Sequence, residues 1–157
     1  MSTMKTTIDR TTFTITFRRA FAASREDVFD AWTDPKRIKY WWDPTGVPLA
    51  DCAIDLRPGG AFRFVNASDH GPPFAGIYRA IERPSRLVFD AMGAVGTVSL
   101  DAEAGTTRMT VTIRCASADH LEQFVKLGID AGTDRTLDNL VTYVAQNRSV
   151  SASGPQL

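Results

Sequence analysis

The chain has 157 residues, of which 43% are hydrophobic and 10% aromatic, and its 18 basic residues balance its 18 acidic ones. A chain of this length is expected to form one domain that buries roughly 70% of the surface of the unfolded chain. Zero net charge argues against a nucleic-acid-binding protein, which usually carries a basic stripe, and against a protein held on membranes by basic clusters. We therefore expect neither nucleic acid nor membrane as a partner.

The residues that most often carry catalysis or metals are scarce. The two histidines are His70 and His120, and the two cysteines are Cys52 and Cys115. Each pair is too widely spaced for a zinc site, and two cysteines do not make a disulfide framework. The P-loop, the dinucleotide fingerprint and the nucleophile elbow are absent from the sequence. We therefore expect no metal, no cofactor and no recognisable catalytic residue.

The cellular location is inferred from composition. No segment approaches 18 consecutive apolar residues, and residues 1–10 lack the apolar stretch of a signal peptide. We therefore expect a cytoplasmic protein. The excess of arginine over lysine and the abundance of alanine are typical of a GC-rich bacterial source.

The domain is expected to cover residues 11–147, between disordered tails at 1–10 and 148–157. Strict alternation predicts a half-buried strand over 12–18, with Phe13, Ile15 and Phe17 on one face.

Two short helices should follow this strand. Ser24 is a favourable N-cap, with acidic residues in the first turn behind it. Asp34 and Pro35 then start a second helix at once, as a cap followed by proline at the first helical position. Trp41 and Trp42 lie on the apolar side of this second segment.

The region from 48 to 115 consists of short apolar runs separated by Gly, Pro, Asp and Ser clusters. This texture is typical of consecutive strands in an antiparallel meander. The predicted strands cover residues 49–56, 61–66, 74–82, 86–92, 95–102 and 107–115.

The last structured stretch is helical, but its apolar stripe changes direction near Gly128. Glycine inside a helix costs about 1 kcal/mol relative to alanine. The sequence therefore predicts a short helix over 118–127 and a long one over 129–146, joined by a kink or break.

These elements predict an α+β fold. A seven-stranded antiparallel sheet should curl around the long C-terminal helix, with the two short helices closing one end. A curled sheet often leaves space between itself and a single helix, and such a cavity would be apolar with a few orienting polar groups.

Four segments carry a resemblance to a known family: AASREDVFDAWTDPKRIKYWW, DLRPGGAFRF, RLVFD and GTDRTLDNL. In their order and spacing they resemble the SRPBCC superfamily, also called START or birch-pollen-allergen-like, which has the helix-grip fold. Within it, the chain is most similar to the bacterial branch named after the activator of the heat-shock-chaperone ATPase. The resemblance implies a cavity for a small molecule rather than one activity. The family often carries tryptophan where this chain has Thr133, which implies a roomier pocket here or one filled from elsewhere in the chain.

Nine residues are the candidate ligand-binding set, because they should face the space between the sheet and the terminal helix. They are Trp41, Trp42, Phe62, Phe64, Tyr78, Phe89, Ile129, Thr133 and Leu137. Core packing is the alternative role for each aromatic residue. The alternative for Thr133 is a bond from its hydroxyl to the carbonyl of the preceding helical turn.

The first functional hypothesis is a protein that binds a small hydrophobic or aromatic molecule. The second is an enzyme of the cyclase, aromatase or hydrolase type, with Tyr78, His70 or a carboxylate as acid or base. A solvated loop is the simpler interpretation of Asp69 and His70.

The third hypothesis is a chaperone partner, although the proteins that gave the family its name use an additional domain for that activity. A homodimer is compatible with the sequence.

Overall fold

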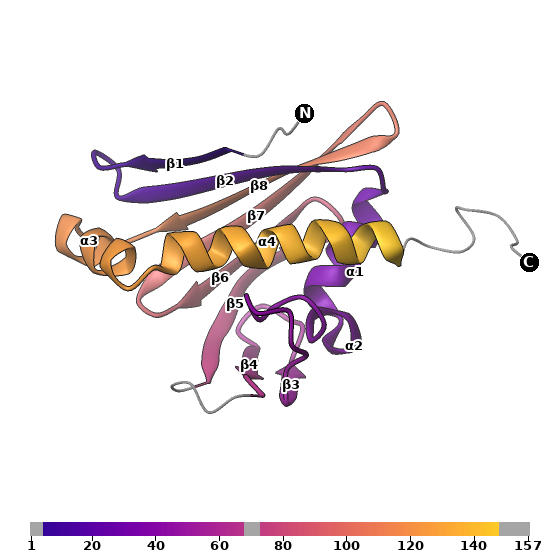
Figure 1. The fold of residues 1–157 in the computed structure, drawn as a ribbon, viewed down its shortest axis with the longest axis horizontal. Coiled ribbons are helices and arrows are strands. Elements are labelled where there is room, and N and C mark those ends of the chain that lie inside the picture. The colour runs from indigo at the N-terminus through magenta and orange to yellow at the C-terminus, as the bar shows by residue number, and fades with distance from the viewer. Residues whose placement is uncertain (1–4, 68–72, 148–157) are drawn as a thin grey trace, which may run out of the picture.

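The computed structural model describes residues 5–67 and 73–147. Within them, eight strands form a single antiparallel sheet in the order β1-β2-β8-β7-β6-β5-β4-β3. The long helix α4 (Ile129–Gln146) lies across the sheet (Figure 1). The strands are β1 (Lys5–Asp9), β2 (Thr14–Phe21), β3 (Asp51–Ile54), β4 (Ala61–Val65), β5 (Phe74–Glu82), β6 (Arg86–Ala91), β7 (Ala94–Glu103) and β8 (Thr106–Arg114). The other helices are α1 (Arg25–Thr33), α2 (Pro35–Ile38) and α3 (Ala118–Lys126).

The predicted α+β, helix-grip architecture is confirmed, but the count of seven strands is wrong. The eighth strand is β1, which lies in the segment expected to be a disordered tail. It pairs with β2 along its whole length, from Lys5 opposite Arg18 to Asp9 opposite Thr14. The β-branched residues of β1 are a weak strand signal alone, and the hydrogen bonds to β2 supply what local propensity does not.

Strand β2 begins at Thr14 and not at the predicted residue 12, because residues 10–13 form a turn. The Asp9 carboxylate accepts hydrogen bonds from the backbone N–H groups of Thr11 and Thr12, at 2.8 and 3.3 Å. These bonds lower the pKa of Asp9. Phe13 has a φ of 58°, in the left-handed region, so it belongs to the turn and not to the strand.

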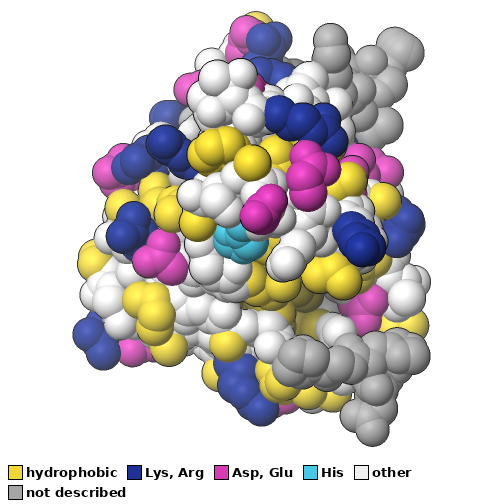
Figure 2. Space-filling view, turned by 90° about the vertical axis from the view of Figure 1, so that its left-hand side faces the viewer, with side chains coloured by type: hydrophobic (Ala, Val, Ile, Leu, Met, Phe, Trp, Pro, Cys, Tyr) yellow, Lys and Arg dark blue, Asp and Glu magenta, His cyan; other side chains and the backbone are white. Residues whose placement is uncertain are grey.

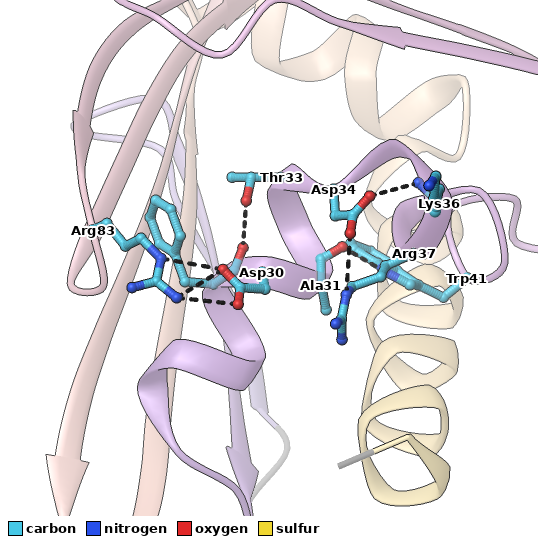
Figure 3. Close-up of polar contacts among 9 residues, drawn as sticks. Asp30, Ala31, Thr33, Asp34, Lys36, Arg37, Trp41 and Arg83 are labelled. Atoms are coloured by element: carbon cyan, nitrogen blue, oxygen red, sulfur yellow. Dashed lines mark hydrogen bonds and ion pairs between the residues drawn. The ribbon is translucent and has the colours of Figure 1, made fainter. Parts of the chain in front are cut away.

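Local capping defines the two short helices where the sequence predicts them. The Ser24 hydroxyl accepts from the N–H of Asp27 at 3.1 Å. The Asp34 carboxylate accepts from the N–H of Lys36 at 2.9 Å (Figure 3). The backbone N–H of Asp34 donates to the carbonyl of Asp30 and so ends α1. One residue therefore ends α1 and begins α2, and the chain turns sharply between them.

The predicted break at Gly128 is confirmed. α3 starts at the N-cap Ser117, whose hydroxyl accepts from the N–H of His120 at 3.1 Å. Gly128 has a φ of 77°, a conformation that costs glycine little and other residues more. α4 starts at the next residue in a new direction.

The core lies between the sheet and α4, and one arginine is buried in it. Arg19 on β2 is only 3% exposed. Its guanidinium contacts the carboxylates of Asp134 and Asp138, one turn apart on α4, at 3.1 and 3.2 Å. It also donates to the carbonyls of Arg18 and Asp134, at 2.9 and 3.1 Å. Arg19 thus fixes α4 against β2.

None of the helices within residues 5–67 and 73–147 is long and apolar enough to cross a membrane. The expected C-terminal tail at 148–157 and the Asp69–His70 loop lie outside the described residues, as do residues 1–4.

Candidate functional site

A pocket of about 540 Å³ lies between the sheet, the segment after α2, and the junction of α3 with α4. This volume is in the range of small-molecule sites. Figure 2 shows the face of the molecule that carries α3, where hydrophobic side chains surround a hollow. The described lining is Trp32, Trp42, Pro44, Asn66, Phe74, Phe89, Ala91, Met92, Ala94, Gly96, Val111, Ile113, Phe124, Leu127, Gly128, Ile129, Gly132, Thr133, Thr136 and Leu137.

The structure brings five of the nine sequence candidates together around this pocket. They are Trp42, Phe89, Ile129, Thr133 and Leu137. They come from three separate parts of the chain: the end of the short-helix segment, strand β6 and helix α4. These parts of the chain therefore border one pocket, which has α4 on one side and the sheet on the other.

Three other candidates lie deeper, in an aromatic cluster behind Trp42. Phe62 is 5.3 Å from Phe64 and 5.0 Å from Tyr78 between ring centroids. The Trp42 ring is 5.0 Å from Phe64, in an edge-to-face arrangement. The space left among these rings is only about 10 Å³, about one water molecule. Phe62, Phe64 and Tyr78 therefore support the pocket wall in this structure.

Trp41, the ninth candidate, packs in the core and does not line the pocket. Its side chain is fully buried, and its indole N–H donates to the carbonyl of Ala31 at 3.1 Å (Figure 3). This bond holds the segment after α2 against α1. The neighbouring residue, Trp42, is half-buried and lines the pocket. The two adjacent tryptophans thus have different environments, which composition and spacing do not distinguish.

Helix α4 holds the Trp42 segment in place by side-chain hydrogen bonds. The Thr136 hydroxyl donates to the carbonyl of Trp42 at 2.9 Å, and the Asn139 amide donates to the carbonyl of Asp43 at 3.0 Å. Thr133 lies one turn before Thr136 and lines the pocket. Within the described part of the chain its hydroxyl has no hydrogen-bond partner, so the alternative of a bond to the preceding turn is not what the structure shows.

Glycines make room for the aromatic walls. A Cβ atom placed on Gly96 of β7 would lie 2.5 Å from the Phe89 ring. The ring therefore lies directly over the backbone of the neighbouring strand, where no side chain could fit. On the opposite side, Gly132 of α4 faces Pro44 with only loose contact, since its Cβ would lie 3.9 Å from the proline ring.

His120 holds the rim of the pocket. Its Nδ1 accepts from the backbone N–H of Ala116 at 2.9 Å, and its Nε2 is 3.1 Å from the carbonyl of Met92. Because a backbone N–H can only donate, Nδ1 is the acceptor and Nε2 carries the proton. The ring also packs edge-to-face on Phe124 at 4.6 Å. Met92 and Phe124 both line the pocket, so His120 joins the β6–β7 turn to α3 there.

Sequence reasoning missed several lining residues, including Phe74, Phe124 and Met92. Phe74 shares the alternation of its strand with Gly76 and Tyr78, and Phe124 lies on the predicted apolar face of the helix over 118–127. These two could have been found from periodicity. Met92 follows a strand in a tight turn, and no pattern predicts that this turn lies against α3.

Burial also affects two groups behind the pocket. It raises the pKa of the Cys52 thiol to about 11, with a smaller contribution from the Asp51 carboxylate. Burial also raises the pKa of the Tyr78 hydroxyl, with a smaller effect of Cys52. Both groups are therefore neutral at physiological pH. Within the described residues, no three His, Cys, Asp or Glu side chains form a metal-binding group.

A second hollow, of about 470 Å³, lies at the start of α1. It is lined by short or charged side chains of residues 22–27 and of the β7–β8 hairpin. Its buried polar side chain, Thr107, already donates to the carbonyl of Ala23 at 2.7 Å. The aromatic pocket is therefore the better candidate for a ligand site.

Comparison with known proteins places the chain in a family. The family model described as Activator of Hsp90 ATPase homolog 1-like protein matches residues 22–145, well over half of the chain. The comparison with curated proteins finds no match.

Solved structures share the fold. A protein from Nitrosomonas europaea is 22% identical, with a TM-score of 0.77 over 85% of this chain and 94% of that one. A protein from Arthrobacter aurescens is 19% identical, with a TM-score of 0.80 over 91% and 92% of the two chains. An AHSA1-like protein from Aeromonas hydrophila is 25% identical, with a TM-score of 0.68 over 83% and 92%. With the family match, this similarity shows that the chain belongs to the Activator of Hsp90 ATPase homolog 1-like family, of the SRPBCC type that its sequence resembles.

Proposed function

We propose that the protein binds a small hydrophobic or aromatic molecule in the pocket between the sheet and α4. The observation that supports this most directly is the pocket of about 540 Å³, walled by aromatic and aliphatic side chains and left unfilled by them. A concave, largely apolar site of this size with a few polar groups is typical of small-molecule binding sites.

Apolar burial would supply most of the affinity. Each Å² of apolar ligand surface removed from water contributes about 25 cal/mol. The walls that would cover the ligand are held in place before it binds, since Trp41, Thr136 and His120 are already hydrogen-bonded. Preformed walls reduce the entropy lost on binding. The two alternatives, a cyclase-like or hydrolase-like enzyme and a chaperone partner, stay predictions.

Native mass spectrometry of freshly purified protein is the test. We expect a stoichiometric adduct that solvent extraction releases and that liquid chromatography identifies as an apolar compound. The same protein after extraction should bind a neutral aromatic probe in equilibrium dialysis. A protein that carries no adduct and binds no such probe would contradict the proposal.

A further inference from the structure

The polar groups of the pocket suggest which class of molecule it takes, and this inference rests on the proposed function. All described lining side chains are uncharged at neutral pH: they are apolar or aromatic, apart from Asn66, Thr133 and Thr136. Transferring a carboxylate, phosphate or ammonium group from water to such surroundings costs several kcal/mol when no opposite charge receives it. The lining thus favours a neutral molecule.

Three lining side chains carry polar groups that no described residue uses: the Asn66 amide, and two donors, on Trp42 and Thr133, near the contact of α4 with the Trp42 segment. The indole N–H of Trp32 is used, since it points at the sulfur of Met109 at 3.4 Å. The hydroxyl of Thr136 is used by the carbonyl of Trp42. The indole N–H of Trp42 and the hydroxyl of Thr133 have no partner within the described residues, and both residues line the pocket.

Both donors belong to residues that line the same pocket, and these residues come from two segments that are in contact. Thr136 contacts the backbone of Trp42 directly, and Thr133 precedes Thr136 by three residues on α4. Residues three apart lie on the same face of a helix, one turn from each other. Gly132 adds no side chain between α4 and the segment that follows Trp42. A ligand in this pocket can therefore contact both Trp42 and Thr133.

We propose that the ligand is an uncharged aromatic molecule that carries a hydrogen-bond acceptor, such as a ketone or similar carbonyl oxygen. Its rings lie against Phe74, Phe89 and Phe124, and its acceptor receives hydrogen bonds from Trp42 Nε1 and Thr133 Oγ1. Trp42 and Thr133 are therefore the specificity-determining residues.

Three probes that share one ring system test this. Naphthalene is neutral without an acceptor, 2-acetylnaphthalene is neutral with a carbonyl, and 2-naphthoate is charged at pH 7.5. In equilibrium dialysis with the extracted full chain, we expect 2-acetylnaphthalene to bind about five- to tenfold more tightly than naphthalene, as one net neutral hydrogen bond implies. We expect 2-naphthoate to bind at least tenfold more weakly than naphthalene.

Conservative variants assign the effect to the two donors. Trp42→Phe keeps an aromatic ring without the N–H, and Thr133→Val keeps the shape without the hydroxyl. Each should weaken binding of 2-acetylnaphthalene severalfold more than binding of naphthalene, so the preference for the carbonyl compound falls. Thr142→Val, at an exposed position of the same helix, is the matched control and should change neither. Thr133→Arg should reverse the preference in favour of 2-naphthoate.

The possible failures are distinguishable. If the three probes bind equally, or 2-naphthoate binds best to the unmodified chain, the inference is wrong while the proposed function stands. It is also wrong if Trp42→Phe and Thr133→Val, shown to be folded by circular dichroism, keep full preference for 2-acetylnaphthalene. If none of the three probes binds and the purified protein carries no apolar adduct, the proposed function and the inference both fail. If an adduct is present but no probe binds, only the inference is overturned.

Discussion

At the scale of single residues, Thr133 decides how much of the pocket stays open. Its half-buried side chain lines the pocket from α4, with a hydroxyl that bonds to no other described group. A larger apolar side chain here would point into the space that a ligand needs. Thr133 is also the position at which the sequence departs from the tryptophan often found in the family it resembles.

Thr133→Trp is expected to fill the pocket. Burying the indole against apolar walls should raise the melting temperature, because the new side chain replaces empty space with contacts. Binding of neutral aromatic probes should weaken at least tenfold. Thermal melts and equilibrium dialysis measure both effects, with Thr142→Trp on the exposed side of α4 as the control. Unchanged probe binding would mean that Thr133 does not face the ligand.

Tyr78 presents a different kind of polar group. It is 3% exposed, and its hydroxyl forms no hydrogen bond with any described residue. A buried hydroxyl without a partner destabilises the folded state, because it loses its hydrogen bonds to water. Tyr78→Phe should therefore raise the free energy of unfolding by about 1 kcal/mol. Urea denaturation measures this, and a loss of stability would show that the hydroxyl has a partner in solution, such as a bound water.

At the scale of elements, the position of α4 depends on a charged contact as well as on apolar packing. Arg19 lies on the core face of β2 and is buried, while the two α4 carboxylates that it contacts, Asp134 and Asp138, are 36% and 52% exposed. Because both carboxylates reach water, removal of Arg19 leaves solvated charges, and the main cost is the space that its side chain fills.

Arg19→Ala is expected to destabilise the protein by about 2–5 kcal/mol, mainly through the cavity that it leaves, with a smaller loss from the contacts to Asp134 and Asp138. Arg19→Met fills the same volume and should cost clearly less. Arg108→Ala, at an exposed ion pair on β8, is a control that should change stability by less than about 1 kcal/mol. Chemical denaturation compares the three. Equal effects of Arg19→Ala and Arg19→Met would show that charge, not volume, holds α4.

The contact between α3 and the β6–β7 turn has a spectroscopic signature. The hydrogen bond from Ala116 N–H requires an unprotonated Nδ1 on His120, so the ring is the Nε2–H tautomer. In ¹⁵N NMR at neutral pH, we expect Nδ1 to show the shift of an acceptor nitrogen and Nε2 that of a protonated one. The opposite tautomer would mean that the ring does not join Ala116 to Met92 in solution.

At the scale of the whole molecule, stability should fall at alkaline pH. Burial raises the pKa of Cys52 from its ordinary value near 9 to about 11, and it raises the pKa of Tyr78 as well. Between pH 9 and 11 the unfolded chain therefore binds fewer protons than the folded one. Stability changes with the difference in bound protons between the two states. The contribution of these two groups is therefore complete below pH 9 and is lost as the pH rises above it.

Thermal melts from pH 7 to 11 measure this decline. A variant with both Cys52→Ala and Tyr78→Phe should show a flatter profile above pH 9 than the unmodified chain. The Cys52 thiol should also react slowly with a disulfide reagent at pH 8 and become fast in urea, since the thiolate is the nucleophile. A fast reaction in the folded state would contradict the raised pKa.

The sequence by itself determined the order of the elements. Ser24, Asp34–Pro35 and Gly128 act on their own neighbours, so the helix starts and the break between α3 and α4 follow from local hydrogen bonding and backbone conformation. The alternation of apolar and polar residues along the strands likewise predicts which side chains share a face of the sheet. These features depend on contacts within a few residues, which a sequence displays directly.

Only the tertiary structure decided which side chains surround the open space. Strand β1 exists because β2 offers it hydrogen bonds, and Arg19 is buried because α4 brings two carboxylates to it. Trp41 and Trp42 are adjacent and chemically identical, yet one bonds to Ala31 in the core and the other lines the pocket. Such differences arise from contacts between residues distant in sequence. The pocket volume is the small remainder between the space that the backbone encloses and the space that the side chains fill, and no local sequence pattern predicts it.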